Sequence, residues 1–385
     1  MQINQTASRT NMADFANETY VEESSLDFLF IFRSIAMVAI MVCAVFGNFL
    51  VIISVYKFYR LRVLTNYFIV SLAFADLLVA LMVMPFSASI EIMNGQWFFG
   101  RTMCDIFNAN DVLFSTASIL HLCCISMDRY IAIMYPLKYD SHMTRVRVLV
   151  MLVITWVSSV CISYIPVHSQ LYTTKENVLE LYNATNTCPF VVNTQYAVMS
   201  SFVSFWIPGA IMVCLYVKIY LEARRQEHAI QSTVMLHTNY HSGLLANGSR
   251  YTDTSEQRNE RKRIKREHKA AKTLGIIMGA FLACFMPFFS WYVITNICQE
   301  ACPYPPVLSS TLFWIGYFNS CLNPIIYAYF NRDFRNAFIK LLKLEKCRCF
   351  RQDSDVVHLN YATNISDHKD MTSVHLSVDT RRQPV

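Results

Sequence analysis

Long apolar stretches alternate with short polar segments along most of this chain. Seven of the apolar stretches are long enough to cross a bilayer, because a transmembrane helix needs about 20 such residues. They are Ser34–Tyr56, Asn66–Ile90, Cys104–Met134, Val148–Val167, Tyr196–Leu221, Thr273–Ile297 and Leu308–Phe330. The seventh stretch is the least uniformly apolar, since it contains Asn319, Ser320 and Asn323. The pattern predicts an all-α membrane protein, a bundle of seven transmembrane helices.

Polar segments surround the predicted bundle. The link 224–266 mixes polar residues with Gly and Ser and then turns basic, which predicts disorder in its middle and helical extensions at each end. Residues 331–349 form an apolar helical face and end in Cys347 and Cys349, which predicts an amphipathic eighth helix on the inner leaflet with two palmitoylation sites. The face consists of Phe334, Phe338, Leu341 and Leu342. The expected parts are therefore an N-terminal segment (1–33), the bundle (34–330), the eighth helix (331–349) and a disordered tail (350–385).

Charge predicts how the bundle is oriented. Only 16% of the 385 residues are charged, and the bases gather after the first, third, fifth and seventh spans. Cytoplasmic loops carry an excess of Lys and Arg, so the N-terminus is expected outside the cell and the C-terminus inside. Orientation thus explains the net charge of +6 better than nucleic-acid binding does. The first 27 residues are polar and acidic, so the first span is expected to act as its own insertion signal in place of a cleavable signal peptide. Glycosylation sequons on the outer side begin at Asn4, Asn17 and Asn183.

Of the 13 cysteines, all but Cys347 and Cys349 fall into two groups. Those inside the spans are expected to act as small packing residues. Four others flank spans on the predicted outer side: Cys104, Cys188, Cys298 and Cys302. Four cysteines allow three pairings. If that side is extracellular, the pairs Cys104–Cys188 and Cys298–Cys302 would leave none of the four cysteines unpaired.

The third span has an acidic residue near each end. Asp111 lies near the outer end, and Asp128 lies about 25 Å further along the helix, next to Arg129. An unpaired carboxylate inside a membrane helix costs on the order of 2.5–3.5 kcal/mol, so it indicates a functional site. No Lys or Arg lies at the depth of Asp111 in any span. A protonated amine from outside would form an ion pair and a charge-assisted hydrogen bond with it.

Hydroxyl and aromatic side chains complete a candidate amine site. Ser200 and Ser204 share a helix face just before Pro208, where their hydroxyls could meet a ligand phenol. The alternative is that these serines donate to carbonyls of their own helix. Aromatic rings could add cation–π and stacking contacts of about 0.5–2 kcal/mol each, although core packing is the alternative for some of them. These rings are Phe288, Phe289, Phe313, Trp314 and Tyr317.

Several motifs resemble the rhodopsin-like G-protein-coupled receptors, from about Arg33 to Cys349. They are Gly47-Asn48-x-x-Val51, Leu72-Ala73-x-Ala75-Asp76, Asp128-Arg129-Tyr130, Trp156, Pro208, Phe285-x-Pro287 and Asn323-Pro324-x-x-Tyr327. Within that class, Asp111 with Ser200-Ser201-x-x-Ser204 is similar to the biogenic-amine receptors. The region from Arg266 to Gly275 is similar to β-adrenergic-type receptors. The stretch Phe114–Cys124 and the pair Trp291-Tyr292 resemble the invertebrate β-type octopamine receptors.

The resemblance implies roles for individual residues. The ligand site would contain Asp111, Val112, Ser115, Ser200, Ser201, Ser204, Phe285, Phe288, Phe289, Tyr292, Phe313 and Tyr317. A sodium ion, which oxygen ligands suit, would be held by Asp76, Ser118, Asn319 and Asn323; the alternative is a water-filled polar network. The activation switch would contain Asp128, Arg129, Tyr130, Tyr216, Glu267, Pro287, Asn323, Pro324 and Tyr327. In that switch Arg129 and Glu267 form an ionic latch, and the helix kinks at Pro287.

The resemblance also implies partners and a cellular setting. It implies a plasma-membrane receptor, not an enzyme, that binds octopamine and acts through a stimulatory heterotrimeric G protein to raise cyclic AMP. Kinases and arrestin would act on the tail, and no cofactor is expected apart from the sodium ion. The alternative is a receptor for tyramine, dopamine or another monoamine with different coupling.

Two departures from the family pattern bear on activity and ligand. Phe285 stands where most amine receptors have Trp, so basal activity is expected to differ. Phe313 stands where β-adrenergic receptors have Asn, which favours a monophenolic amine.

Other classes fit less well. A retinal receptor needs a Lys in Leu308–Phe330, which has none. A transporter would be expected to show internal repeats and broken half-helices. A membrane enzyme needs a catalytic constellation, and His121, the only His well inside a span, lacks an obvious partner in the sequence.

Overall fold

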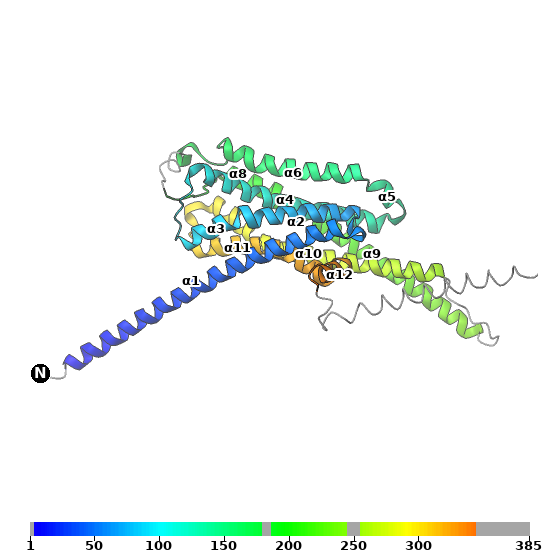
Figure 1. The fold of residues 1–385 in the computed structure, drawn as a ribbon, viewed down its shortest axis with the longest axis horizontal. Coiled ribbons are helices and arrows are strands. Elements are labelled where there is room, and N and C mark those ends of the chain that lie inside the picture. Colours follow the sequence, from blue (N-terminus) through cyan, green and yellow to red (C-terminus); the bar gives the residue numbers. More distant parts are fainter. Residues whose placement is uncertain (1–3, 179–185, 245–254, 344–385) are drawn as a thin grey trace, which may run out of the picture.

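The computed structural model describes residues 4–178, 186–244 and 255–343, although it leaves undescribed the side chains of 4–29, 227, 229–244, 255–271 and 300. The regular elements of this described part are helices, and the long ones lie side by side in one bundle (Figure 1). The helices that build it are α1 (Asn4–Lys57), α2 (Leu64–Met82), α3 (Met84–Ile92), α4 (Gly100–Met134), α6 (Arg145–His168), α8 (Thr194–Ser201), α9 (Ile207–Leu244), α10 (Ser255–Cys298) and α11 (Pro306–Phe330).

Six helical stretches in the described residues are long and apolar enough to cross a membrane: Phe30–Lys57, Leu64–Ile92, Gly100–Met134, Arg145–His168, Thr194–Gln226 and Lys272–Cys298. The seventh, α11, is 25 residues long but more polar. Its Asn319 and Asn323 are each only 2% exposed, so they face other helices and not lipid. Because α11 packs against α1 and α10, it completes the bundle, and the predicted seven-helix architecture is confirmed.

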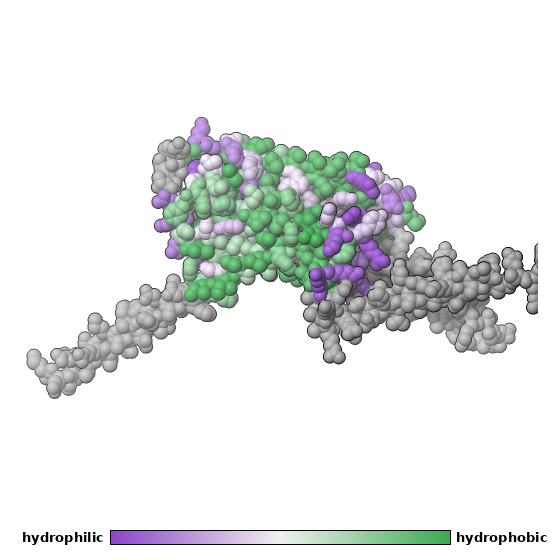
Figure 2. Space-filling model, in the orientation of Figure 1, coloured by the Kyte–Doolittle hydropathy of each residue, from purple (hydrophilic) through white to green (hydrophobic). Residues whose placement is uncertain are grey.

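The surface of the bundle matches a membrane environment. Figure 2 shows hydrophobic residues covering the visible side of the bundle, with hydrophilic residues gathered towards its two ends. One end carries both disulfide bonds, Cys104–Cys188 and Cys298–Cys302, and is called the disulfide end below. The other end carries α5 (Tyr139–His142) and α12 (Arg332–Leu341) and is called the opposite end.

Helix boundaries differ from the predicted ones at three places. α1 begins at Asn4, well before Ser34, and projects beyond the bundle (Figure 1). The second span is interrupted at Val83, where α2 gives way to α3, because Pro85 has no backbone N–H to continue the ladder. The fifth span contains a π-helical turn, Phe202–Trp206, just before Pro208. Such turns insert a residue into the helical register and are frequent at functional sites.

The predicted eighth helix forms as α12, but its apolar face has another partner. Asn331 caps it by accepting a hydrogen bond from the backbone N–H of Asp333 at 3.1 Å. Phe334 is fully buried and stacks on the ring of Tyr327, with centroids 5.4 Å apart. Phe338 is also buried, whereas Leu342 is 40% exposed. Two residues of the predicted apolar face, Phe334 and Phe338, thus pack against the protein and Leu342 stays exposed, and the position of this helix on the leaflet stays a prediction.

α4 is positioned to carry the functional residues. It packs against α2, α6, α9 and α10, so both of its ends meet several neighbours. On the other side of the bundle, Gly47 lets α1 approach α11 closely, because an added Cβ there would lie 2.8 Å from Cβ of Pro324. This close packing of the helices holds the polar residues of α2, α4 and α11 against one another.

Candidate functional site

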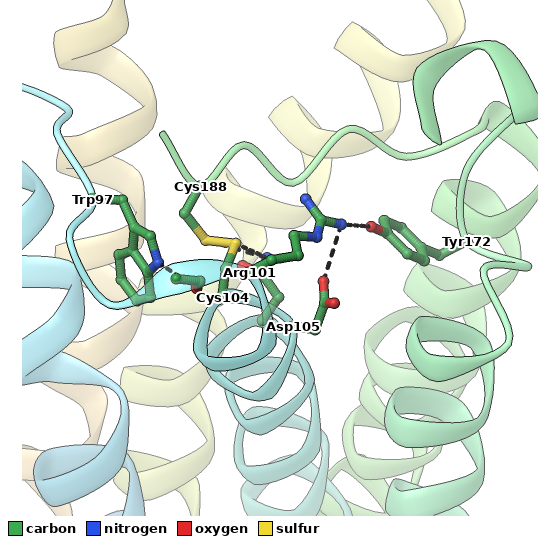
Figure 3. The surroundings of a disulfide bond; sticks show 8 residues. Trp97, Arg101, Cys104, Asp105, Tyr172 and Cys188 are labelled. Carbon is green, nitrogen blue, oxygen red and sulfur yellow. Dashed lines mark hydrogen bonds and ion pairs between the residues drawn. A yellow bond between two sulfur atoms is a disulfide. The ribbon is translucent and has the colours of Figure 1, made fainter. Parts of the chain in front are cut away.

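The disulfide end is tied to α4 by several contacts (Figure 3). Cys104, in the first turns of α4, is bonded to Cys188, and their Cα atoms are 5.7 Å apart. The guanidinium of Arg101 donates to Asp105 at 3.0 Å and to the hydroxyl of Tyr172 at 3.2 Å. Burial raises the pKa of Tyr172, while the charge of Arg101 opposes that rise. The loop before α8 is thereby fixed over the start of α4.

Asp111 lies seven residues beyond Cys104, about two helical turns further into the bundle. The hydroxyls of Tyr317 and Ser115 lie beside its carboxylate, and Tyr317 also lies beside Ser87 on α3. The ion pairs of the described side chains join Arg33 to Glu91, Arg101 to Asp105, Arg129 to Asp128 and Arg225 to Glu222. Asp111 belongs to none of these pairs. Neutral hydroxyls lie next to its carboxylate, which can therefore still form an ion pair with a cation.

The serines of the fifth span have partners within the protein. Ser200 and Ser201 both donate to the carbonyl of Ala197, at 3.3 and 2.6 Å. Ser201 is fully buried, and Ser200 is partly exposed and also contacts Tyr292. Ser204 accepts a hydrogen bond of 3.0 Å from Thr116 on α4. The back-bonding alternative thus describes Ser200 and Ser201 in this structure, and Ser204 links the fifth span to α4.

Aromatic rings form a continuous path from α10 to the partner of Asp111. Phe288 stacks on Tyr292 at 5.8 Å and contacts Phe313 at 4.8 Å, and Phe313 contacts Tyr317 at 6.3 Å. Phe289 is instead stacked on Phe205 at 4.6 Å within the core.

The remaining predicted site residues flank this path. Phe285 packs against Gly316, whose Cβ position would be 3.4 Å from the Phe285 ring. Trp314 makes an edge contact with Tyr317 at 5.5 Å. Val112, next to Asp111, is partly exposed.

Asp76 on α2 is fully buried among neutral donors. It accepts hydrogen bonds from Ser118 at 3.0 Å, Ser320 at 3.1 Å and the amide of Asn323 at 2.8 Å. Asn319 lines the adjoining cavity. Sequence reasoning missed Ser320, although its spacing of three residues from Asn323 places both on one helix face. The carboxylate of Asp76 and the hydroxyls of Ser118 and Ser320 are oxygen ligands of the kind that a hard cation prefers, whereas Asn323 turns its amide N–H to the carboxylate.

One small cavity joins the surroundings of the two acids. It is lined by Asp76, Val79, Ser115, Ser118, Phe285, Gly316, Tyr317, Asn319 and Ser320. Ser115 and Tyr317 also contact Asp111, so the cavity runs from the Asp111 partners down to Asp76. Among the residues with described side chains, no group of three His, Cys, Asp or Glu forms a metal site.

At the opposite end of α4, Asp128 and Arg129 are held in a local network. The buried carboxylate of Asp128 accepts hydrogen bonds from Thr65 at 2.8 Å, Tyr139 at 2.8 Å and the Nε of Arg129 at 2.9 Å. Arg129 also donates to the hydroxyl of Thr65. Burial raises the pKa of Tyr139 above its ordinary value, so it remains a donor at neutral pH. The sequence did not identify Thr65 and Tyr139 as partners, because neither belongs to the Asp128-Arg129-Tyr130 motif.

His121 has a fixed tautomer. Its Nδ1 lies 2.6 Å from the carbonyl of Ala117 and must donate, so Nε2 accepts from the hydroxyl of Ser71 at 2.7 Å. The indole of Trp156 donates to the same hydroxyl at 3.1 Å. His121 thus has hydrogen-bond partners on α4 and α2 that the sequence did not reveal.

Several predicted residues lie outside what the structure describes. They are Asn183, Cys347 and Cys349, together with the side chains of Asn4, Asn17 and Glu267. Glycosylation, palmitoylation and the Arg129–Glu267 latch therefore stay predictions.

The sequence analysis did not identify one exposed apolar residue. Leu137, in the turn after α4, is 92% exposed.

Comparison with known proteins agrees with the fold and with the motifs. Residues 47–327 match the family described as 7 transmembrane receptor (rhodopsin family). The chain is 48% identical over 347 residues to octopamine receptor beta-2R of Chilo suppressalis, covering 88% of this chain and 87% of that one. It is 50% identical to octopamine receptor beta-1R of Drosophila melanogaster over 79% of this chain and 60% of that one. It is 41% identical to the D(1B) dopamine receptor of Xenopus laevis over 87% of this chain and 74% of that one. The chain belongs to the rhodopsin family of seven-transmembrane receptors, which are not enzymes.

Proposed function

We propose that this chain is a plasma-membrane receptor for octopamine that acts through a stimulatory G protein to raise cyclic AMP. The observation that carries the proposal is Asp111, an acid inside the bundle that neutral hydroxyls contact and that belongs to none of the ion pairs of the described side chains. Such a carboxylate favours a ligand that brings its own positive charge. Similarity to proteins named as octopamine receptors supports the identity of the amine.

The site suggests how a monophenolic amine would bind. Its ammonium would pair with Asp111, and its ring would lie against the path formed by Phe288, Phe313 and Tyr317. Its phenol would point to the fifth span, where the hydroxyl of Ser204 already accepts a hydrogen bond from Thr116. Ser204 has a second lone pair and a proton of its own for the ligand. One phenolic hydroxyl is sufficient for this arrangement, which favours octopamine over a catecholamine.

The oxygen-rich surroundings of Asp76 would hold a sodium ion in the resting receptor. The ion would be contacted by the carboxylate of Asp76 and the hydroxyls of Ser118 and Ser320, with Asn319 and Asn323 beside it. The hydroxyls now donate to Asp76 and would turn their lone pairs to the ion. An ion there would oppose a rearrangement of α11 against α2.

Activation would begin from the network at the opposite end, which the proposed orientation places in the cytoplasm. Arg129 is engaged by Asp128 and Thr65, which describes a resting arrangement. A swing of α10 about Pro287 would open that end to a G protein, provided that the agonist binds the open state more tightly. Leu137 would give the G protein an exposed apolar contact there. Kinases and arrestin would then act on the tail.

The test is a cyclic-AMP assay in transfected cells challenged with octopamine, tyramine, dopamine, serotonin and noradrenaline. Octopamine is expected to be the most potent, with tyramine next because it lacks only the side-chain hydroxyl. A higher potency for dopamine or tyramine would overturn the identity of the ligand. A fall in cyclic AMP, or a calcium signal alone, would overturn the proposed coupling while leaving the amine site intact.

A further inference from the structure

Gly275 on α10 lies where the side chain of Tyr216 on α9 touches the helix backbone. A Cβ atom added at Gly275 would lie 2.5 and 2.6 Å from two ring carbons of Tyr216, and nearer still to its hydroxyl oxygen. Real Cβ atoms essentially never come within 3.0 Å of such neighbours, so Tyr216 can take this position only because residue 275 is glycine. Gly279, one turn further along α10, has nothing within 4 Å of its Cβ position.

We propose that Gly275 is a positioning residue: it forms a slot that holds Tyr216 against α10 in the resting receptor and thereby lowers signalling without agonist. The inference rests on the proposed function, because the activity at issue is the coupling to a G protein. It adds to that function a specific residue that sets the balance between the resting and open states.

The geometry explains why the slot exists only at rest. Gly275 precedes Pro287 by 12 residues, which is about 18 Å along a helix. A change of about 20° in the kink at Pro287 would therefore move Gly275 by about 6 Å. A displacement of that size is larger than the distance of about 4 Å within which two groups are in contact. The contact of Tyr216 with α10 is thus lost when α10 swings, and Tyr216 is free to turn elsewhere.

A methyl group at position 275 would act on the resting state alone. The atoms it would strike belong to the far end of the Tyr216 side chain, which can rotate away without unfolding either helix. The added methyl group therefore raises the free energy of the resting state, in which the two residues touch. It does not raise that of the open state, in which they are already apart. Raising the free energy of one state shifts the population towards the other.

The experiment compares Gly275→Ala with Gly279→Ala, which makes the same change one turn away and gains the same helix propensity. Cyclic AMP without agonist is measured in cells and normalised to surface expression. Gly275→Ala is expected to raise it at least threefold, and Gly279→Ala to leave it unchanged. In a Tyr216→Ala background, Gly275→Ala is expected to have no further effect, because the ring that it strikes is absent. Equal basal signals for the two glycine variants would overturn the proposal, as would an effect that persists without the ring.

A second readout separates this inference from the proposed coupling. Hydrogen–deuterium exchange of the purified receptor in lipid nanodiscs reports the opening of α10 without any G protein or ligand. Faster exchange around residues 270–280 in Gly275→Ala than in Gly279→Ala supports the slot, even if cyclic AMP fails to respond to every amine and the coupling is wrong. Equal exchange in the two variants refutes the slot. If Gly275→Ala does not reach the cell surface, recovery of surface expression in Gly275→Ala/Tyr216→Ala supports the contact and no recovery refutes it.

Discussion

Replacing Asp111 by asparagine removes one negative charge and keeps the shape of the side chain. Two unit charges 4 Å apart attract each other by about 4 kcal/mol at an effective dielectric constant of 20. The amide oxygen of asparagine would still accept a hydrogen bond from the charged ammonium, worth about 1.5 kcal/mol. The difference between these two values gives an expected loss of about 2–3 kcal/mol. At 1.4 kcal/mol per tenfold, the affinity for octopamine should fall roughly 30- to 150-fold.

Competition binding on membranes from transfected cells measures this loss, with surface expression followed by an epitope label. The matched control is Asp105→Asn, which changes the same residue type on the same helix. Asp105 pairs with Arg101 and is partly exposed, so its loss should change affinity by no more than about threefold, as for most exposed ion pairs. Affinity within threefold of wild type for Asp111→Asn, at normal surface expression, would refute the ion-pair role of Asp111.

Three further changes test other parts of the site. Ser204→Ala should weaken a phenolic amine about 2- to 10-fold in binding, the worth of one hydrogen bond, and spare phenethylamine; equal losses would indicate structural damage. Cys104→Ala should destabilise the purified protein about 2.5 kcal/mol more than Cys298→Ala in thermal melting, because the two bridges span 84 and 4 residues; equal melting temperatures would contradict this. Leu137→Ala should lower the cyclic-AMP maximum and leave amine affinity unchanged without G protein, since burying a leucine stabilises a complex by about 1.5–3 kcal/mol; an unchanged maximum would remove Leu137 from the coupling surface.

The transmembrane spans could be predicted because lipid imposes a simple condition on them. A helix that crosses the hydrocarbon core must satisfy its own backbone and present apolar side chains, and both requirements are visible as apolar length. The acids within the spans, Asp76, Asp111 and Asp128, stood out for the same reason, since a charge inside a membrane helix is costly unless it has a function. α11 shows the limit of the rule, because Asn319 and Asn323 are tolerated only through burial inside the bundle, where Asn323 donates to Asp76 on α2.

The partners of those acids could not be predicted, because they come from distant parts of the chain. Asp128 meets Thr65 and Tyr139, and these contacts depend on how α2 and the turn after α4 pack. The apolar face of α12 was visible in the sequence, but whether lipid or Tyr327 would cover it was not. Likewise, Pro208 marked a disturbance in the fifth span without specifying a π-helical turn.

The acids Asp76, Asp111 and Asp128 differ in the chemistry of their partners, and that difference separates their roles. Asp128 has a guanidinium beside it and two hydroxyl donors, so its charge is already balanced within the protein. Asp76 has three neutral donors and is fully buried, which leaves room for a small ion but none for an organic amine. Asp111 has neutral hydroxyl partners and is only partly buried, near the disulfide end. It is therefore the acid to which a cationic ligand entering from that end would bind.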